Sequence, residues 1–131
     1  MANKENWEVS YIDEDGVYHG DVQGGLLLGA NSIYTASGAI AITDNAVCLD
    51  TLTAGGTMAM TLADGVIGQS IIIYLGNATN SATVSFLGLN AGLNLVTLPA
   101  IGDSATLVFL YNIVGAGKWV VTNLEGTASV S

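Results

Sequence analysis

Large apolar residues alternate with small or polar ones over much of the chain after residue 30. Residues 57–62 follow this alternation, and residues 81–87 and 104–111 combine it with β-branched and aromatic side chains. A period of two residues is typical of a strand with one buried face. Gly, Asn and Asp gather between these runs, where turns need them. The pattern predicts strands near residues 7–12, 16–19, 32–42, 46–52, 57–62, 69–75, 81–87, 93–98, 104–111 and 117–122.

Helical periodicity is missing from the same region. No stretch between residues 33 and 125 places apolar residues at helical spacing opposite charged ones, and Lys, Glu, Gln and Arg are scarce there. Many short strands separated by turns usually form a sandwich, a jelly roll or a small barrel. We therefore expect an all-β fold, an antiparallel β-sandwich or jelly roll of about 8–10 short strands preceded by a polar N-terminal arm or hairpin.

Residues 70–75 depart from the alternation because they are mostly apolar at consecutive positions. Such a run is typical of a strand that is covered on both faces. One face would pack in the domain's own core, and the other would lie under the N-terminal arm or against another subunit. We expect Ile71 and Ile73 at such a subunit interface, with Trp119 either in the core or at the seam between subunits.

The chain is strongly acidic. It has 131 residues, of which 11 are acidic and 2 are basic, so its formal net charge is -9. Nucleic-acid binding needs cations that displace counterions from phosphate. The chain has only two, Lys4 and Lys118, and this shortage excludes DNA and RNA as direct partners. The same shortage excludes a polybasic membrane anchor. Monomers usually protect strand edges with Lys, so a body with little charge and one lysine indicates packing against other subunits or a larger assembly.

Six of the eleven acids fall within the first 21 residues, which divides the chain into two parts. We expect an acidic N-terminal arm or hairpin over residues 1–25 and a β-sandwich body over residues 26–131. Trp7 and Tyr11 are four residues apart and therefore lie on the same side of an extended arm. With Tyr18, they are our candidate contact with a partner protein, since aromatic side chains are common interface anchors.

The N-terminus has neither the basic start nor the apolar run of a signal peptide, and no apolar run is long enough to span a membrane. We expect a protein that is made and used without export or membrane insertion. Cys48 is the single cysteine, which excludes an internal disulfide, and its alternating surroundings favour a small buried hydrophobe.

Catalytic chemistry has few candidates. His19 is the only histidine, and its place in the charged hairpin favours a solvated turn residue over a member of a catalytic triad or a zinc site. Asp44, Asp64 and Asp103 each lie in a turn, which explains them more simply than a glycosidase carboxylate pair. Residues 13–16 favour a hairpin turn over a calcium loop because no closing Glu follows. We expect no enzyme activity, no catalytic residue, no metal and no cofactor.

The order of several short motifs between about residues 42 and 126 resembles that in β-rich modules of tailed-bacteriophage virions. Residues 61–69 read Thr-Leu-Ala-Asp-Gly-Val-Ile-Gly-Gln and precede a hydrophobic strand. Residues 102–107 read Gly-Asp-Ser-Ala-Thr-Leu, and residues 117–119 read Gly-Lys-Trp. The order of these motifs, more than any single one, carries the likeness.

The resemblance implies a structural role in a virion, since modules of this type occur in capsid decoration (cement) proteins, head fibres and tail fibres, commonly as homotrimers. A chain of this length without a repetitive shaft favours a decoration protein. It would bind the major capsid protein on the outer capsid surface and be made in the host cytoplasm. The alternative is a tail-fibre or head-fibre module that recognises host glycans through loops 76–80 and 112–117. The resemblance brings no catalytic residues with it.

Overall fold

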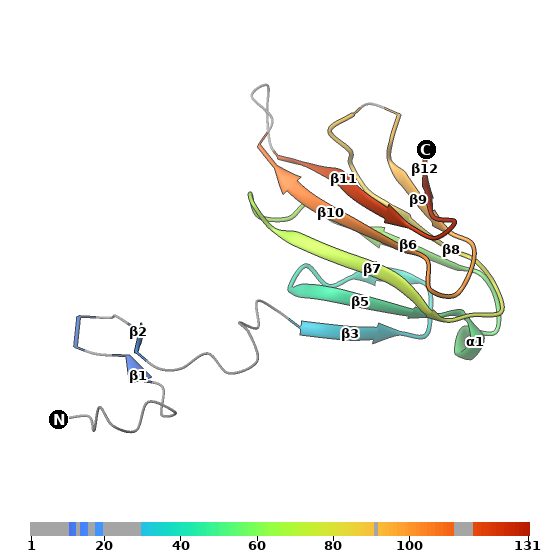
Figure 1. Cartoon of the computed structure of the whole chain (residues 1–131), viewed down its shortest axis with the longest axis horizontal. Coiled ribbons are helices and arrows are strands. Elements are labelled where there is room, and N and C mark those ends of the chain that lie inside the picture. Colours follow the sequence, from blue (N-terminus) through green and yellow to red (C-terminus); the bar gives the residue numbers. More distant parts are fainter. Residues whose placement is uncertain (1–10, 13, 16–17, 20–29, 91, 112–116) are drawn as a thin grey trace.

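The computed structural model describes residues 11–12, 14–15, 18–19, 30–90, 92–111 and 117–131. Residues 30–131 form a sandwich of two five-stranded sheets, as Figure 1 shows. We call the sheet with strand order β11-β10-β7-β5-β3 the β7 sheet, and the sheet with order β12-β9-β8-β6-β4 the β8 sheet. The prediction of an all-β sandwich is confirmed.

The elements are short and closely spaced along the chain. The β7 sheet contains β3 (Ala30–Tyr34), β5 (Asp44–Asp50), β7 (Ser70–Asn77), β10 (Ser104–Leu110) and β11 (Lys118–Glu125). The β8 sheet contains β4 (Gly38–Ile40), β6 (Met58–Leu62), β8 (Ala82–Ser85), β9 (Leu95–Leu98) and β12 (Ser129–Val130). One four-residue helix, α1 (Thr51–Ala54), follows β5; its N-cap is Asp50, and it ends at Gly55, whose φ of 75° is left-handed.

The chain crosses from one sheet to the other after each strand from β3 to β7. As a result β3, β5 and β7 are parallel neighbours in one sheet, and β4, β6 and β8 are parallel neighbours in the other. The later strands β9, β10, β11 and β12 then add antiparallel pairs to both sheets. The sheets are therefore mixed, and the expectation of purely antiparallel pairing is wrong. Alternation along a strand records which side is buried, but it does not record the direction of the neighbouring strand.

The core lies between the sheets and takes alternate side chains from the central strands. On β7, Ile71 and Ile73 are fully buried, whereas Ile72 between them is 39% exposed. Trp119 on β11 is also fully buried. The predicted interface role of Ile71 and Ile73 is thus wrong, because both side chains pack inside their own subunit, and of the two places expected for Trp119, the core is the one observed.

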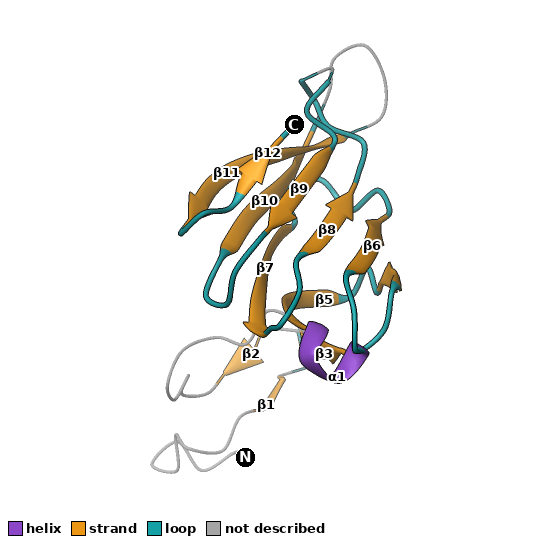
Figure 2. Cartoon of the chain, turned by 90° about the vertical axis from the view of Figure 1, so that its right-hand side faces the viewer, coloured by secondary structure: helices purple, strands orange, loops and turns teal. Residues whose placement is uncertain are grey.

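Strand direction places the connections at the two ends of the sandwich. The end that we call the loop end carries residues 41–43 and 63–69, the described part of 86–94, Tyr111 and Gly117. The opposite end carries α1 and the connections at 35–37, 78–81, 99–103 and 126–128. Figure 2 shows β6 and β8 pointing away from α1 toward the loop end.

Part of the N-terminal arm is described. β1 (Tyr11–Ile12) and β2 (Tyr18–His19) pair antiparallel, with Tyr11 opposite His19, which is the hairpin expected there. Trp7 lies outside the described residues, as do the side chains of Tyr11 and Tyr18. The division of the chain into an arm over residues 1–25 and a body over 26–131 stays a prediction.

Candidate interaction surfaces

Exposed large apolar side chains gather at the loop end. Twelve such side chains are exposed among the described residues, and seven of them lie on the connections of this end. These seven, which we call the apolar loop end, are Ile42, Val66, Ile67, Leu87, Leu89, Leu93 and Tyr111. Val66 is 72% exposed and Tyr111 is 66% exposed. Such a cluster on a folded domain marks a surface that contacts another molecule.

Polar contacts hold the loops of this end together and so give the cluster a fixed shape. Gln69 bridges two loops: its Nε2 donates to the Ile42 carbonyl at 2.6 Å, and its Oε1 accepts the Val66 N–H at 2.9 Å. The Gly68 N–H donates to the Phe109 carbonyl at 2.7 Å, which ties the same loop to β10.

Trp119 anchors the loop end from inside. Its indole Nε1 donates to the Ala63 carbonyl at 2.9 Å. Gly65 passes so close to the ring that a β-carbon there would lie 2.9 Å from Cζ2 of Trp119. The Trp119 backbone also pairs with Leu87 and Leu89, through hydrogen bonds of 3.0 and 2.9 Å. Two separate loops therefore converge on one buried side chain.

The motifs behind the family resemblance thus have structural roles in this fold. Gly65 lies against the ring of Trp119 and against the side-chain oxygen of Gln69. Gly117 lies directly against the ring of Phe109, which packs edge-on to Trp119 with ring centroids 5.1 Å apart. These residue types are required by close packing, so they do not by themselves point to a ligand.

Asp103, in the second motif, fastens the opposite end of the sandwich. Its buried carboxylate accepts hydrogen bonds from the Ala100 N–H at 2.7 Å, from the Thr127 N–H at 2.8 Å and from the Thr127 hydroxyl at 2.7 Å. Burial opposes ionisation, but the hydrogen bonds from Thr127 and Ala100 outweigh it, and the pKa of Asp103 is lowered. The carboxylate joins the turn before β10 in one sheet to the turn before β12 in the other.

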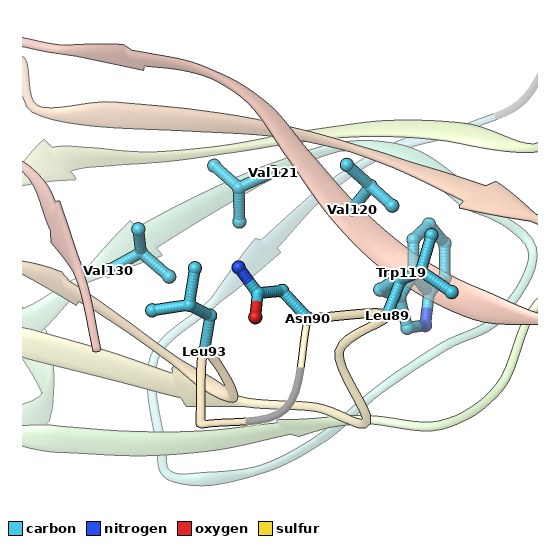
Figure 3. A pocket seen from close by; sticks show the side chains of 7 residues that line it. All are labelled: Leu89, Asn90, Leu93, Trp119, Val120, Val121 and Val130. Atoms are coloured by element: carbon cyan, nitrogen blue, oxygen red, sulfur yellow. The ribbon is translucent and has the colours of Figure 1, made fainter.

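An apolar hollow of about 440 Å³ opens beside Leu89 and Leu93 of the apolar loop end. It is lined by Leu89, Asn90, Leu93, Trp119, Val120, Val121 and Val130 (Figure 3). The hollow lies between β11 and β12, which are the edge strands of the two sheets. Figure 3 shows the Asn90 side chain between those of Leu89 and Leu93. Besides the indole N–H of Trp119, which donates to the Ala63 carbonyl, the Asn90 amide is the one polar side-chain group in the lining. This lining suits a large apolar side chain of a partner.

A polar hollow of about 270 Å³ lies where β5 and β7 begin. It is lined by Thr43, Asp44, Asn45, Gly68, Gln69 and Ser70. The Asp44 carboxylate is buried, and its two oxygens accept hydrogen bonds from the Ser32 and Tyr34 hydroxyls, both at 2.6 Å. Asp44 is therefore a structural acceptor. Within the described part of the chain, no group of three or more His, Cys, Asp or Glu residues is placed to hold a metal ion.

The outer face of the β7 sheet carries eight apolar side chains, with polar ones such as Ser70, Ser104 and Thr106 among them. Its apolar side chains, which we call the apolar face, are Ile33, Ala46, Cys48, Ile72, Tyr74, Val108, Leu110 and Val120. Cys48, expected in the core, is half-buried on this face because it lies on the opposite side of β5 from the buried Val47 and Leu49. Hydrogen bonding to the Cys48 thiol, together with partial burial, raises the pKa of Tyr74.

The outer face of the β8 sheet is covered by smaller side chains. Its members, which we call the hydroxyl face, are Ala39, Ala59, Thr61, Thr83, Ser85, Leu95, Thr97 and Ser129. Ala59, Thr83, Thr97 and Ser129 form one row across four strands. None of the twelve exposed large hydrophobic side chains of the described residues belongs to this face.

Sequence reasoning missed the apolar loop end and the apolar face. One signal was available at the loop end: Val66 and Ile67 stand between Gly65 and Gly68, in a turn where polar residues are usual. A large apolar pair in such a turn indicates a surface contact when no helix or strand explains it.

Comparison with known proteins identifies no relative, so the interpretation of function depends on the geometry of the structure. No model of a known protein family matches the chain, and no curated protein matches it either. Across the residues that the structure describes, no helix has the length and apolar character needed to span a membrane.

Proposed function

We propose that this protein is a structural component of a virus particle, a capsid decoration (cement) protein that binds the outer shell as a homotrimer and stabilises it. The observation that supports this most is the apolar loop end, where seven of the twelve exposed large hydrophobic side chains gather on a body with little charge. A decoration protein needs a surface of this kind to hold the major capsid protein. The motif order that resembles virion modules supports the same role.

The N-terminal arm joins the body on the side of the apolar loop end. β3 begins at the loop end with Ala30, so the chain that precedes it is attached there. Trp7, Tyr11 and Tyr18 would then add aromatic anchors to the same contact. In a trimer three such ends act together, and contacts that are weak one by one add up to durable attachment.

Shell binding by two charge variants tests the role of the loop end. Val66→Lys places a cation in the apolar loop end, and Ile101→Lys places the same charge at the opposite end, where Ile101 is 63% exposed. With capsids prepared without the decoration protein, Val66→Lys should bind at least about tenfold more weakly than the wild type, a loss of about 1.4 kcal/mol. Ile101→Lys should bind as the wild type does. Equal binding by both variants would exclude the loop end as the attachment surface.

Removal of residues 2–20 tests the arm separately. We expect a folded oligomer that no longer binds shells, because the aromatic anchors are gone. Circular dichroism checks the fold, and sedimentation with capsids measures binding. Undiminished binding would exclude the arm from attachment and leave the body as the whole contact.

A fibre-tip module that recognises host glycans is the second candidate, and the polar hollow favours it. Thr43, Asn45 and Ser70 bring hydroxyl and amide groups that suit sugar hydroxyls. Immunogold labelling of particles separates the two functions. Label spread over the head supports the decoration role, whereas label confined to the tail supports glycan recognition.

A further inference from the structure

We infer that the apolar face of the β7 sheet is the surface through which copies of this chain meet, around a three-fold axis that runs along the strands. The occupants of this face are therefore further copies of the same chain. The inference deepens the proposed function, on which the number of three copies rests. The inference assigns the contact between subunits to the outward residues Ile72 and Tyr74 of β7, in place of the buried Ile71 and Ile73 on the same strand.

The hydrophobic surface of the apolar face is continuous across β3, β5 and β7, whereas on β10 the polar Ser104 and Thr106 stand opposite Tyr74 and Ile72. Ile33, Cys48 and Tyr74 stand opposite one another on β3, β5 and β7, and Ala46 stands opposite Ile72 in the neighbouring row. Ile33 is 68% exposed and Ile72 is 39% exposed in the single chain. Covering apolar surface of this kind stabilises an assembly by about 25 cal/mol for each Å² removed from water.

The distribution of charge allows a copy of this chain to occupy the face. With a formal net charge of -9, two copies repel each other in most orientations. Among the described strands of the β7 sheet, charge on the outer face is confined to the margins, with Lys118 and Glu125 at the two ends of β11 and Asp50 at the end of β5. Asp50 is turned toward α1 by hydrogen bonds from Thr53. Copies can therefore meet over the centre of this face without opposing carboxylates.

The size of the face fits a small assembly. Five strands spaced about 4.8 Å apart, with a rise of about 3.3 Å per residue, give the sheet a footprint of roughly 500 Å². Three copies that cover this face would bury roughly 1,500 Å² in total, divided among three pairwise interfaces of roughly 500 Å² each, so the trimer would depend on all three contacts forming together. Two copies would bury roughly 1,000 Å² in a single interface, just below the range of about 1,200–2,000 Å² for standard stable interfaces.

The direction of the axis follows from the place of the attachment surface. Cyclic symmetry about an axis along the strands points every loop end in the same direction. Three apolar loop ends then face one shell together, as multivalent attachment requires. The hydroxyl face lies on the other side of each sandwich and stays in water, where its small polar side chains are readily solvated.

Sedimentation equilibrium of the full chain and two matched variants tests the inference. Ile72→Lys adds a charge to the central strand of the apolar face, and Thr83→Lys adds the same charge to the central strand of the hydroxyl face. The wild type and Thr83→Lys should have three times the 13.3 kDa mass of the chain. Ile72→Lys should show a threefold drop to the mass of one chain. Both variants should keep the circular dichroism of the wild type, because neither residue belongs to the core.

A monomeric wild type, or an Ile72→Lys variant that stays trimeric, overturns the inference. So does dissociation by Thr83→Lys alone. A wild-type dimer that Ile72→Lys dissociates would overturn the three-fold axis. A trimer that Ile72→Lys dissociates but that binds no shell would remove the proposed attachment while leaving the interface between copies in place. Should Ile72→Lys fail to fold, Ile72→Thr takes its place in the same measurement.

Discussion

The two sheets of this sandwich are wound in the same way, yet their outer faces carry different side chains. Each sheet has three parallel strands followed by two antiparallel additions, and both cover the same core. Outward positions of the β8 sheet hold mainly Thr, Ser and Ala, whereas those of the β7 sheet include the exposed Ile33, Ile72 and Leu110. The fold needs only the inward side chains, which are apolar in both sheets.

Folding of the single subunit therefore does not explain why the outer face of the β7 sheet carries large apolar side chains. A β8 sheet covered by hydroxyl and methyl groups shows that this topology folds without large apolar residues on its outer face. Those of the β7 sheet have no role in the core, and exposing them to water brings no gain in stability. The contact between copies proposed above would be the physical reason for keeping them. The following experiments test this contrast.

The largest effect should be a difference in the free energy of unfolding between substitutions on the two sides of β7. Ile73→Ala removes a fully buried side chain and should lower the free energy of unfolding by about 2–5 kcal/mol. Ile72→Ala, on the apolar face, should lower it by less than about 1 kcal/mol in the isolated subunit. Urea denaturation at one dilute protein concentration measures both. Equal losses would contradict the contrast, because they would mean that one subunit covers both sides of this strand by itself.

Loss of the Asp103 carboxylate should weaken the sandwich without changing either outer face. Asp103→Ala leaves the N–H groups of Ala100 and Thr127 without their acceptor and should lower the free energy of unfolding by roughly 2–3 kcal/mol. Sedimentation should show the wild-type oligomer at concentrations where the variant is folded. A folded variant that is monomeric would link the interface to the turns rather than to the apolar face.

The pH dependence of the same group has a definite sign. Because the pKa of Asp103 is lowered in the folded state, its contribution is complete above the ordinary carboxyl pKa of about 3.9 in the unfolded chain. That contribution is lost as the pH falls through the lowered pKa of the folded state. Urea titrations from neutral into strongly acidic solution should show a smaller acid loss for Asp103→Ala than for the wild type. Parallel curves would contradict this assignment.

A smaller effect is expected when the apolar face is made to resemble the hydroxyl face. Ile72→Thr combined with Val120→Thr removes apolar groups worth about 0.8 kcal/mol per methylene. Association should weaken by at least about tenfold, while the isolated subunit keeps its fold. Sedimentation over a concentration series measures the change. Unaltered association would show that these side chains do not hold the copies together.

The smallest effect should come from the hydroxyl face itself. Thr83→Ala and Thr97→Ala should each change the free energy of unfolding by no more than about 0.5 kcal/mol, since both side chains lie outside the core. The mass of the oligomer should stay the same. A change in mass would mean that the row containing these threonines is itself a contact surface.

Much of the fold could be predicted from alternation, because every second residue is apolar in a strand that has one buried face. The strand β6 follows the predicted run 57–62 closely, and β10 lies within 104–111. Pairing direction was not predictable, since it depends on the path of the chain between the sheets. The alternation of apolar and polar residues within each strand is the same whether β3 to β8 pair in parallel or antiparallel.

The candidate surfaces were harder to predict for a related reason. On β7 the outward Ile72 is as apolar as the inward Ile71 and Ile73, so the sequence indicates two covered faces without telling which one packs in the core. Trp119 presents the same difficulty, because an interface and a core use the same side chain. The apolar loop end needed the tertiary structure, since Gln69 and Trp119 bring together loops that are far apart in sequence.

Alkylation of Cys48 tests most directly whether neighbouring copies cover the apolar face of the β7 sheet. This thiol is the single cysteine of the chain and lies on β5, beside Tyr74 of the central strand β7. We expect a maleimide to react with the native wild type at least about tenfold more slowly than with Ile72→Lys at the same protein concentration. Equal rates in the two proteins would contradict the account.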